Sequence, residues 1–308
     1  MTAPRILYKY VSEEGFERIW DSEKIRFTQL SQLNDPYENR IFDPNIDMKI
    51  HELSKLSNND ERSTFAFLHG EKHTIDKQFK DIQNEIDNRF GILSLTRNPA
   101  NLLMWSHYAN EHKGVVIGID VSNPIFKESG VIRNPDEGNV VYSSIKPRNF
   151  KPFEIKRQKQ EKGDGYTFIL EPNDQIHIDF VLLYKSIDWA YEEEVRIVRD
   201  FYIEKGEIKL VDNKEIALFP LPKSAIKYVI FGERYDKKQS KDFILENMGV
   251  SNEFKIEFIQ ASIEEYQYKV RLSLLNNILK TQKTQILRPP IIKGQMIEGK
   301  NNRKKRKK

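Results

Sequence analysis

The apolar stretches of this chain have the length of β-strands. None of them reaches the roughly 18 residues that a membrane-spanning helix needs. Runs such as GILSLT at 91–96 and GVVIGID at 114–120 are short enough to be buried strands. Segments with helical spacing lie between such runs, as in Phe16, Ile19 and Trp20 behind the capping residue Ser12. The pattern predicts an α+β protein, a single domain with a mixed or mainly antiparallel sheet.

The predicted domain covers residues 1–287 and contains a helical insert at about 45–89, where scattered apolar positions interrupt a polar sequence. Residues 102–109 are predicted to form a helix, and so is the leucine-rich segment from Val270 to Leu279. Residues 146–165 show no period and are predicted to be a mobile loop, whereas 176–184 fits a helix or a strand. The remaining predicted strands are 6–10, 24–28, 140–142, 194–198, 208–211, 216–218, 226–231 and the alternating residues Phe254, Ile256 and Phe258.

The positive charge of the chain is concentrated in its last residues. Nine of the 50 basic residues and one of the 46 acidic residues lie in 284–308, so the rest has 41 basic and 45 acidic residues. Residues 288–308 are predicted to be a disordered basic tail, ending in six consecutive basic residues, Arg303–Lys308. Such a tail adds salt-sensitive attraction to nucleic acid or to an anionic membrane surface, or serves as a solubilising end.

Composition excludes several classes of function. The chain has no cysteine, which rules out disulfides, thiolate metal sites and a cysteine nucleophile. Its start, MTAPRILYKY, lacks the apolar stretch of a signal peptide, so we expect a cytoplasmic protein without membrane insertion. No glycine-rich phosphate loop follows a predicted strand, which argues against P-loop ATP hydrolysis and against hydride transfer on a Rossmann fold.

The segment 186–198 combines aromatic and acidic residues with an apolar strand pattern. On a strand, Glu192, Glu194 and Arg196 share one face, so two carboxylates and a guanidinium converge. The alternative is a solvated edge where Arg196 merely neutralises the glutamates. A one-residue shift of register decides which of Glu192 and Glu194 faces a pocket.

Two further segments carry candidate site residues. On a helix, Trp105 and Tyr108 share one face, and His107 and Glu111 share another. The spacing H-x-x-x-E-H from His107 to His112 matches no known metalloprotease, so no metal is predicted. In the first strand, aromatic residues alternate with Lys9, and the turn Asn34–Glu38 adds polar groups. Such a set suits a nucleotide or another flat anionic ligand, although the aromatics fit a core equally well.

These motifs, in their order, resemble a known family. LYKY, IRFTQLSQLNDPYE, ILSLT, MWSHYANEHKGVVIGID and YKSIDWAYEEEVRIV together look like the bacterial family catalogued as domain of unknown function 2971. The resemblance extends from about Leu7 to Arg196, and more weakly to Gly232. Tyr37 stands where the family usually has Phe, and Val195 where it usually has Trp, and both keep an apolar body.

The layout also resembles, more weakly, the ADP-ribosyltransferases of toxin and phage-defence systems. That likeness implies NAD as the substrate. It implies that Lys9 and Tyr10 contact the dinucleotide, and that Trp105 or Tyr108 stacks on nicotinamide. His107 would contact ribose or phosphate.

The acidic segment takes the catalytic roles in this likeness. Cleavage of the nicotinamide–ribose bond develops an oxocarbenium-like cation, which a fixed carboxylate stabilises. The resemblance gives that part to Glu194. Arg196 would orient this carboxylate or bind a phosphate oxygen, and Glu192 would accept the proton of the acceptor.

Three functions remain open from the sequence. The leading hypothesis is an NAD-consuming ADP-ribosyltransferase or glycohydrolase, an effector in phage defence or a toxin system that an antitoxin or a defence-system partner would restrain. The alternative is a non-enzymatic sensor that binds a nucleotide or nucleic acid through the pocket and the tail. The third is a metal-dependent nuclease built on Asp188, Glu192, Glu194 and His107, which no tight carboxylate–histidine spacing supports.

Overall fold

The fold comes from a computed structural model, which describes residues 5–38, 77, 80–81, 83–145, 153–159, 166–172, 179–204, 206–211 and 214–275. Most of the predicted insert at 45–89 and all of the predicted tail at 288–308 lie outside these residues.

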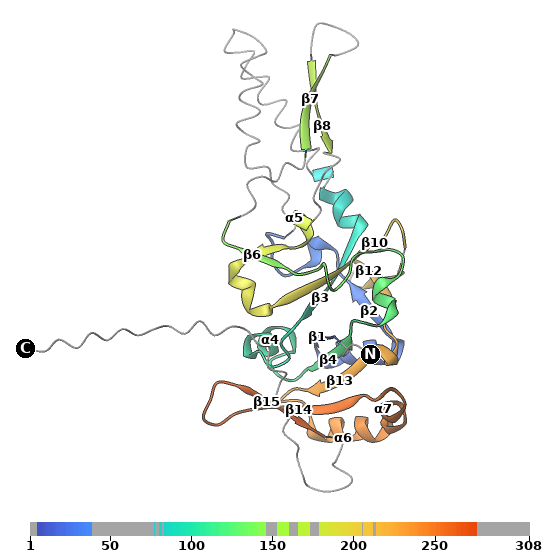
Figure 1. Ribbon diagram of the computed structural model, residues 1–308, viewed down its shortest axis with the longest axis vertical. Helices are drawn as coiled ribbons and strands as arrows, with labels where there is room; N and C mark the ends of the chain where they lie inside the picture. The colour runs from blue at the N-terminus through green and yellow to red at the C-terminus, as the bar shows by residue number, and fades with distance from the viewer. Residues whose placement is uncertain are drawn as a thin grey trace, which may run out of the picture.

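The body is built on an eight-stranded sheet (Figure 1). Neighbouring strands are antiparallel, except for the parallel pair in which Tyr228 faces Glu257. The predicted α+β class with a mixed, mainly antiparallel sheet is therefore confirmed. Across the sheet, the strands are β15 (Val270–Leu274), β14 (Glu257–Ile263), β13 (Ile226–Phe231), β4 (Val115–Asp120), β1 (Ile6–Val11), β3 (Phe90–Thr96), β10 (Glu194–Asp200) and β5 (Val131–Arg133).

Smaller sheets complete the β-structure. One has three strands in the order β11 (Glu207–Val211), β12 (Lys214–Pro220) and β2 (Lys24–Phe27). Two others are pairs: β6 (Val141–Ser143) with β9 (Tyr184–Ser186), and β7 (Phe153–Lys159) with β8 (Tyr166–Pro172). The parallel β6–β9 pair fixes the end of β9 directly before the acidic segment Ile187–Glu192.

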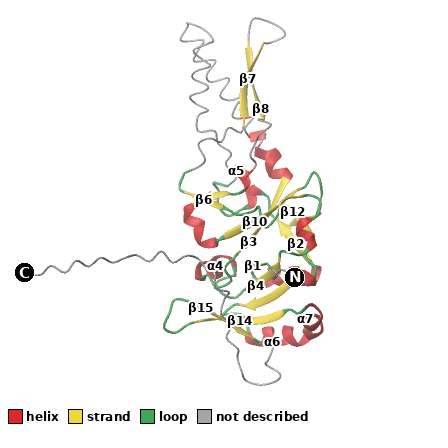
Figure 2. Cartoon of the chain, in the orientation of Figure 1, coloured by secondary structure: helices red, strands yellow, loops and turns green. Residues whose placement is uncertain are grey.

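Short helices connect and cover the strands. The Ser12 hydroxyl caps the first of them by accepting a hydrogen bond from the Gly15 amide at 3.1 Å, as predicted. Figure 2 shows the two helices of the C-terminal part beside β14. No described helix is long and apolar enough to cross a membrane. The α-helices are α1 (Glu13–Ser22), α4 (Leu102–Tyr108), α5 (Asp179–Leu182), α6 (Lys237–Glu246) and α7 (Met248–Phe254), and the 3-10 helices are η1 (Leu30–Gln32), η2 (Pro124–Lys127), η3 (Ile187–Glu192) and η4 (Lys223–Ala225).

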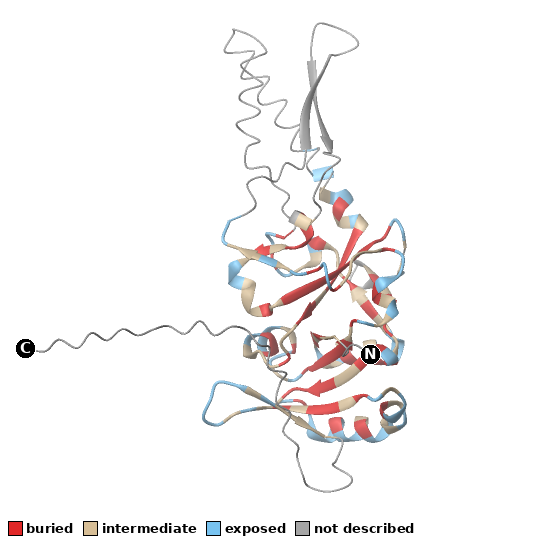
Figure 3. Ribbon diagram, viewed as in Figure 1, coloured by how far each residue is buried: buried red, intermediate tan, exposed pale blue. Residues whose placement is uncertain are grey.

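Figure 3 shows that the central strands of the eight-stranded sheet are largely buried. The two faces of this sheet contact different groups of buried residues. Leu7 of β1 and Val195 of β10 belong to the largest cluster, together with Phe16 of α1. Tyr8 and Tyr10 point to the other face, where α4 packs. Because side chains alternate along a strand, residues 194 and 196 of β10 lie opposite to Val195, on the face away from this largest cluster.

Three sequence predictions outside the site are wrong. Val270–Leu274 is strand β15 rather than the start of a helix, because its apolar residues alternate with Arg271 and Ser273 and the backbone pairs with β14. Residues 153–159, within the predicted loop, form β7 and pair with β8. The strand was missed because its sequence, FEIKRQK, is rich in basic residues and has few apolar positions to show an alternation. Phe254 ends α7, so the last alternating strand begins only at Glu257.

Candidate functional site

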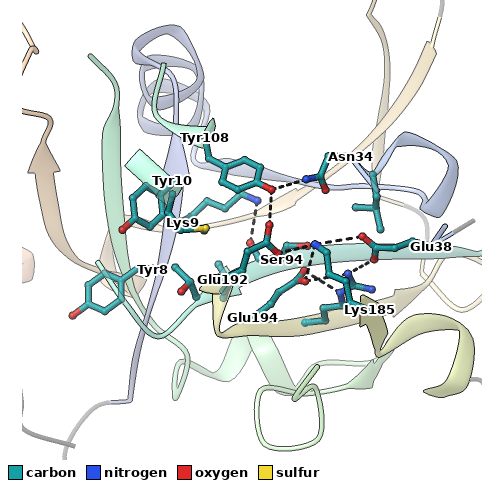
Figure 4. A pocket seen from close by; sticks show the side chains of 15 residues that line it. Tyr8, Lys9, Tyr10, Asn34, Glu38, Ser94, Tyr108, Lys185, Glu192 and Glu194 are labelled. Carbon is teal, nitrogen blue, oxygen red and sulfur yellow. Dashed lines mark hydrogen bonds and ion pairs between the residues drawn. The ribbon is translucent and has the colours of Figure 1, made fainter. Parts of the chain in front are cut away.

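The eight-stranded sheet opens between β1 and β3. Strand β1 pairs with β4 along its whole length, but it faces β3 at a single position, Tyr8 opposite Thr96. A pocket of about 450 Å³, including space open to solvent, lies at this opening (Figure 4). Its lining comes from segments far apart in the sequence: Tyr8, Lys9, Tyr10, Leu33, Asn34, Glu38, Ser94, Leu95, Thr96, Met104, Tyr108, Lys185, Glu192, Glu194 and Arg196.

Strand β10 supplies a buried ion pair to the pocket. Its first and third residues, Glu194 and Arg196, share one face, as the alternation predicts. The Arg196 Nε donates to Glu194 Oε1 at 2.9 Å and its Nη2 donates to Oε2 at 3.0 Å, which is a bidentate contact. Arg196 is 0 % exposed and Glu194 4 %. The alternative interpretation of this segment as a solvated edge is therefore wrong.

Glu192 enters the pocket by a different route from the one predicted. It does not lie on the strand but ends η3, and Glu193, with φ of 45°, turns the chain into β10. Because of this turn, the carboxylates of Glu192 and Glu194 both line the pocket. The register of the strand therefore does not decide between them.

Lys185 is the centre of the cluster and was not singled out from the sequence. Its Nζ lies 2.6 Å from Glu192 Oε2, 3.4 Å from Glu194 Oε2 and 3.4 Å from Glu38 Oε1. It comes from the short strand β9, whose three residues carry little sequence signal. One buried ammonium thus holds three carboxylates together.

Glu38 links this cluster to the Asn34–Glu38 turn near the N-terminus. One of its oxygens accepts from Arg196 Nη2 and the other lies against Lys185. Arg196 Nη1 also donates to the backbone oxygen of Leu182 at 2.7 Å, at the end of α5. The guanidinium therefore ties the turn, α5 and β10 to one point.

Burial and the neighbouring charges shift the pKa values of this cluster in opposite directions. Burial raises the pKa of Glu194, yet Arg196 and Lys185 outweigh burial and lower it to about 2. Burial lowers the pKa of Lys185, but Glu194, Glu38 and Glu192 raise it to about 12. Glu194 and Lys185 therefore stay charged at neutral pH. Burial raises the pKa of Glu38 above its usual value, against the charges of Arg196 and Lys185.

Lys9 faces the pocket from the other side of the opening. Its Nζ donates to the backbone oxygen of Ser94 at 3.0 Å, across the gap where the β1–β3 ladder stops. Burial lowers the pKa of Lys9, while Glu194 and Glu192 oppose this. An ammonium with three donors keeps donors for a ligand after one contact to the backbone.

Tyr108 of α4 and Asn34 complete the polar wall. The Tyr108 hydroxyl donates to Glu192 and accepts from the Asn34 side-chain amide. Burial raises the pKa of Tyr108, and the hydrogen bond to Glu192 raises it further. The phenol is thus a proton donor at the pocket over the physiological pH range.

Of the other residues predicted to contact a ligand, Tyr10 lines the pocket, whereas Trp105 and His107 do not. Trp105 is 0 % exposed, stacks edge-on against Tyr10 and donates to the backbone oxygen of Pro99, so it is a core residue and does not line the pocket. Tyr10 lines the pocket, but its hydroxyl donates to the Asn98 backbone oxygen at 2.9 Å. His107 is exposed and lies outside the lining, with its ring centroid 6.3 Å from that of Tyr191.

The residues of the nuclease hypothesis are not assembled. Asp188 is exposed and accepts from the Ser186 hydroxyl at 2.9 Å, while Glu192 and Glu194 contact Lys185. In the part of the chain that the structure describes, no group of three or more histidine or acidic residues is arranged to hold a metal ion.

A comparison with protein-family models matches residues 104–197 to a family described as protein of unknown function (DUF2971). This match confirms the resemblance to that family for the segment from Met104 to Ile197. The N-terminal motifs that line the opposite wall of the pocket lie outside the matched range. No curated protein and no solved structure matches the chain.

Proposed function

We propose a function for this DUF2971 protein from the pocket itself: it binds NAD and cleaves the nicotinamide–ribose bond, passing the ADP-ribosyl group to an acceptor or to water. The observation that carries the proposal is the pair of carboxylates, Glu192 and Glu194, fixed at the opening between β1 and β3. The weaker resemblance to toxin and phage-defence transferases supports a role as an effector of that kind.

The two carboxylates suit different tasks. A carboxylate has about four positions for accepting hydrogen bonds. Those of Glu194 are engaged by Arg196, Lys185 and Ser94, so Glu194 acts as a fixed negative charge. Glu192 receives hydrogen bonds from Tyr108 and Lys185 and keeps capacity for a ligand. We therefore assign to Glu192 the contact with the ribose hydroxyl or with the attacking group.

Cleavage of the nicotinamide–ribose bond needs both a fixed negative charge and a carboxylate that can accept a proton. When the C1′–N bond breaks, nicotinamide leaves with the bonding electrons and C1′ becomes cationic. A carboxylate that stays ionised, like Glu194 with a pKa of about 2, stabilises this cation more than it stabilises neutral groups. The acceptor then bonds to C1′ and gives its proton to Glu192. Lys9, which retains free donors, binds a phosphate oxygen of the dinucleotide.

A second function is favoured by the same geometry. Because Glu194 is engaged on both oxygens, the cluster also resembles a rigid wall that recognises a nucleotide without converting it. This sensor would bind NAD or another nucleotide through Lys9 and Tyr108 and would release no nicotinamide.

Nicotinamide release by the purified full chain separates the two functions. The variants to compare are Glu192→Gln, Glu194→Gln and, as a matched control, Glu193→Gln, whose carboxylate contacts Asn98 and lies outside the pocket lining. We expect release by the wild type and by the control, and loss of release in Glu192→Gln with NAD binding retained. Binding of NAD without release by the wild type would favour the sensor, and neither binding nor release would refute both.

A further inference from the structure

Two lysines line the pocket, and they have different partners. Lys185 contacts three carboxylates through its ammonium. Lys9 Nζ donates to the Ser94 backbone oxygen at 3.0 Å and takes part in no ion pair within the described part of the chain. The Lys9 side chain is partly buried and extends toward Tyr108 and Glu192 (Figure 4). Lys9 is therefore an amine that a ligand can reach and that no described carboxylate holds.

The surroundings of Lys9 favour its uncharged form more than water does. Burial lowers the pKa of Lys9. The carboxylates of Glu194 and Glu192 oppose this effect, while the positive charges of Arg26 and Lys185 add to it. After one hydrogen bond to the backbone, a neutral amine keeps one hydrogen and its lone pair. Such a lone pair is the nucleophile with which buried lysines attack a carbonyl carbon.

A second group of the lining lacks a hydrogen-bond partner. Glu38 is 6 % exposed, and its Oε1 accepts no hydrogen bond from the described residues, although Lys185 Nζ lies 3.4 Å away. Its other oxygen accepts from Arg196. A buried polar atom without a partner costs free energy until a ligand or a water supplies one. A hydroxyl group, which both donates and accepts, fits Glu38 Oε1 whether this carboxyl is ionised or protonated.

Tyr108 and Glu192 supply a route for protons beside Lys9. The Tyr108 hydroxyl donates a hydrogen bond to Glu192. Burial and this hydrogen bond raise the pKa of Tyr108, so the phenol keeps its proton at neutral pH. A proton donor in contact with a carboxylate can give a proton to one atom of a ligand while the carboxylate accepts one from another.

We propose that the pocket binds a small aldehyde or ketone that carries hydroxyl groups, and that Lys9 joins its carbonyl carbon as an imine. The lone pair of Lys9 Nζ bonds to the carbonyl carbon, and both amine hydrogens leave with the carbonyl oxygen as water. Tyr108 and Glu192 carry these protons from nitrogen to oxygen, and nothing is oxidised or reduced. A hydroxyl group of the ligand bonds to Glu38 Oε1. The reaction needs no NAD and goes beyond the proposed function.

Lys9 has a different protonation state in the proposed NAD complex. A phosphate oxygen beside Nζ favours the ammonium, because opposite charges stabilise each other. An ammonium has no lone pair and does not attack a carbonyl carbon. NAD and the carbonyl ligand therefore compete for Lys9.

Reductive trapping of the imine with cyanoborohydride tests this inference on the full chain, with labelled peptides quantified by mass spectrometry. The probe is D-glyceraldehyde, and the matched probe is propanal, which has the same carbon chain without the hydroxyl groups. Lys238 of α6 is exposed and serves as the reference within the same protein. The variants are Lys9→Arg, which keeps a positive charge but forms no imine, Tyr108→Phe, and the control Tyr268→Phe at a residue that is 98 % exposed.

We expect glyceraldehyde to label Lys9 at neutral pH at least about tenfold faster than Lys238, because the pocket orients the carbonyl group against the amine. The fast label should disappear from the intact mass of Lys9→Arg. Tyr108→Phe should slow the labelling of Lys9 without slowing that of Lys238, and Tyr268→Phe should change neither. Propanal should show a smaller preference for Lys9. Labelling of Lys9 no faster than that of Lys238, or an equal preference with propanal, would overturn the inference.

Added NAD separates this inference from the proposed function. Slower labelling of Lys9 in the presence of NAD would support both, because the two ligands would then share one pocket. Fast labelling of Lys9 in a protein that neither binds nor cleaves NAD would support the imine and refute the proposed function. Nicotinamide release by a protein whose Lys9 reacts no faster than Lys238 would leave the proposed function standing and overturn the imine.

Discussion

Replacing Arg196 by Met should destabilise this protein far more than the loss of an ordinary charged residue. Arg196 is fully buried and holds Glu194 at 2.9 and 3.0 Å, Glu38 through a further contact, and the Leu182 backbone oxygen at 2.7 Å. Met fills much of the volume, and among the ion pairs of the described residues it leaves Glu194 the contact with Lys185 at 3.4 Å. Breaking a buried ion pair from one side costs about 3–5 kcal/mol.

The expected loss lies at the upper end of that range, about 4–5 kcal/mol, because the guanidinium serves two buried carboxylates. At roughly 2–4 °C per kcal/mol for a domain of this size, the melting temperature should fall by about 10 °C or more. The double variant Arg196→Met/Glu194→Gln should lose less than the sum of its single variants, because the residues are in contact.

Urea unfolding measures these losses as changes of midpoint at constant slope. The matched control is Arg18→Met, which makes the same substitution in an exposed pair with Glu14 at 3.0 Å, where the side chains are 72 % and 79 % exposed. This control should change the unfolding free energy by less than about 0.5 kcal/mol. If Arg196→Met lost no more than Arg18→Met, the cluster would not organise the pocket as described.

Three further perturbations test other parts of the structure. Burial raises the pKa of Glu194, but Arg196 and Lys185 bring it from 4.5 down to about 2, so this carboxylate stabilises the fold above pH 4.5. Roughly 3 kcal/mol should be lost as the pH falls to about 2, and urea unfolding of Glu194→Gln should lack that part of the pH dependence. Gly138→Ala should cost about 1–3 kcal/mol in the same assay, because a Cβ there would lie 1.7 Å from the Arg196 backbone oxygen, whereas Gly249→Ala meets nothing within 4 Å. Deleting Arg303–Lys308 should weaken retention on a single-stranded nucleic-acid column at low salt while nicotinamide release stays the same; unchanged retention would remove the role of the tail.

Strands and helices whose apolar residues recur with a simple periodicity were predictable from the sequence. The alternation of Glu194 and Arg196 with Val195 and Ile197 gave both the strand and the shared face of the ion pair. The cap at Ser12 and the buried strand at 115–120 likewise follow from local rules. At 270–274, leucines extending beyond Leu274 suggested a helix, whereas tertiary pairing with β14 selects the strand.

The composition of the pocket depends on contacts that local patterns do not encode. Glu38 reaches Arg196 across 158 positions of the chain, and its burial is decided by the turn that carries it. Lys185 sits on a strand of three residues, too short for a period to show. Trp105 shares a helix with Tyr108, and the spacing alone did not reveal that Trp105 packs in the core while Tyr108 reaches the pocket.

Nicotinamide release from NAD by the wild type beside Glu192→Gln tests the central claim most directly. The account predicts continuous release by the wild type and by Glu193→Gln, and none by Glu192→Gln, which should still be folded at the assay temperature and still bind NAD. If Glu192→Gln released nicotinamide as fast as the wild type, or if the folded wild type released none under any condition, the assignment of this pocket to NAD cleavage would be contradicted.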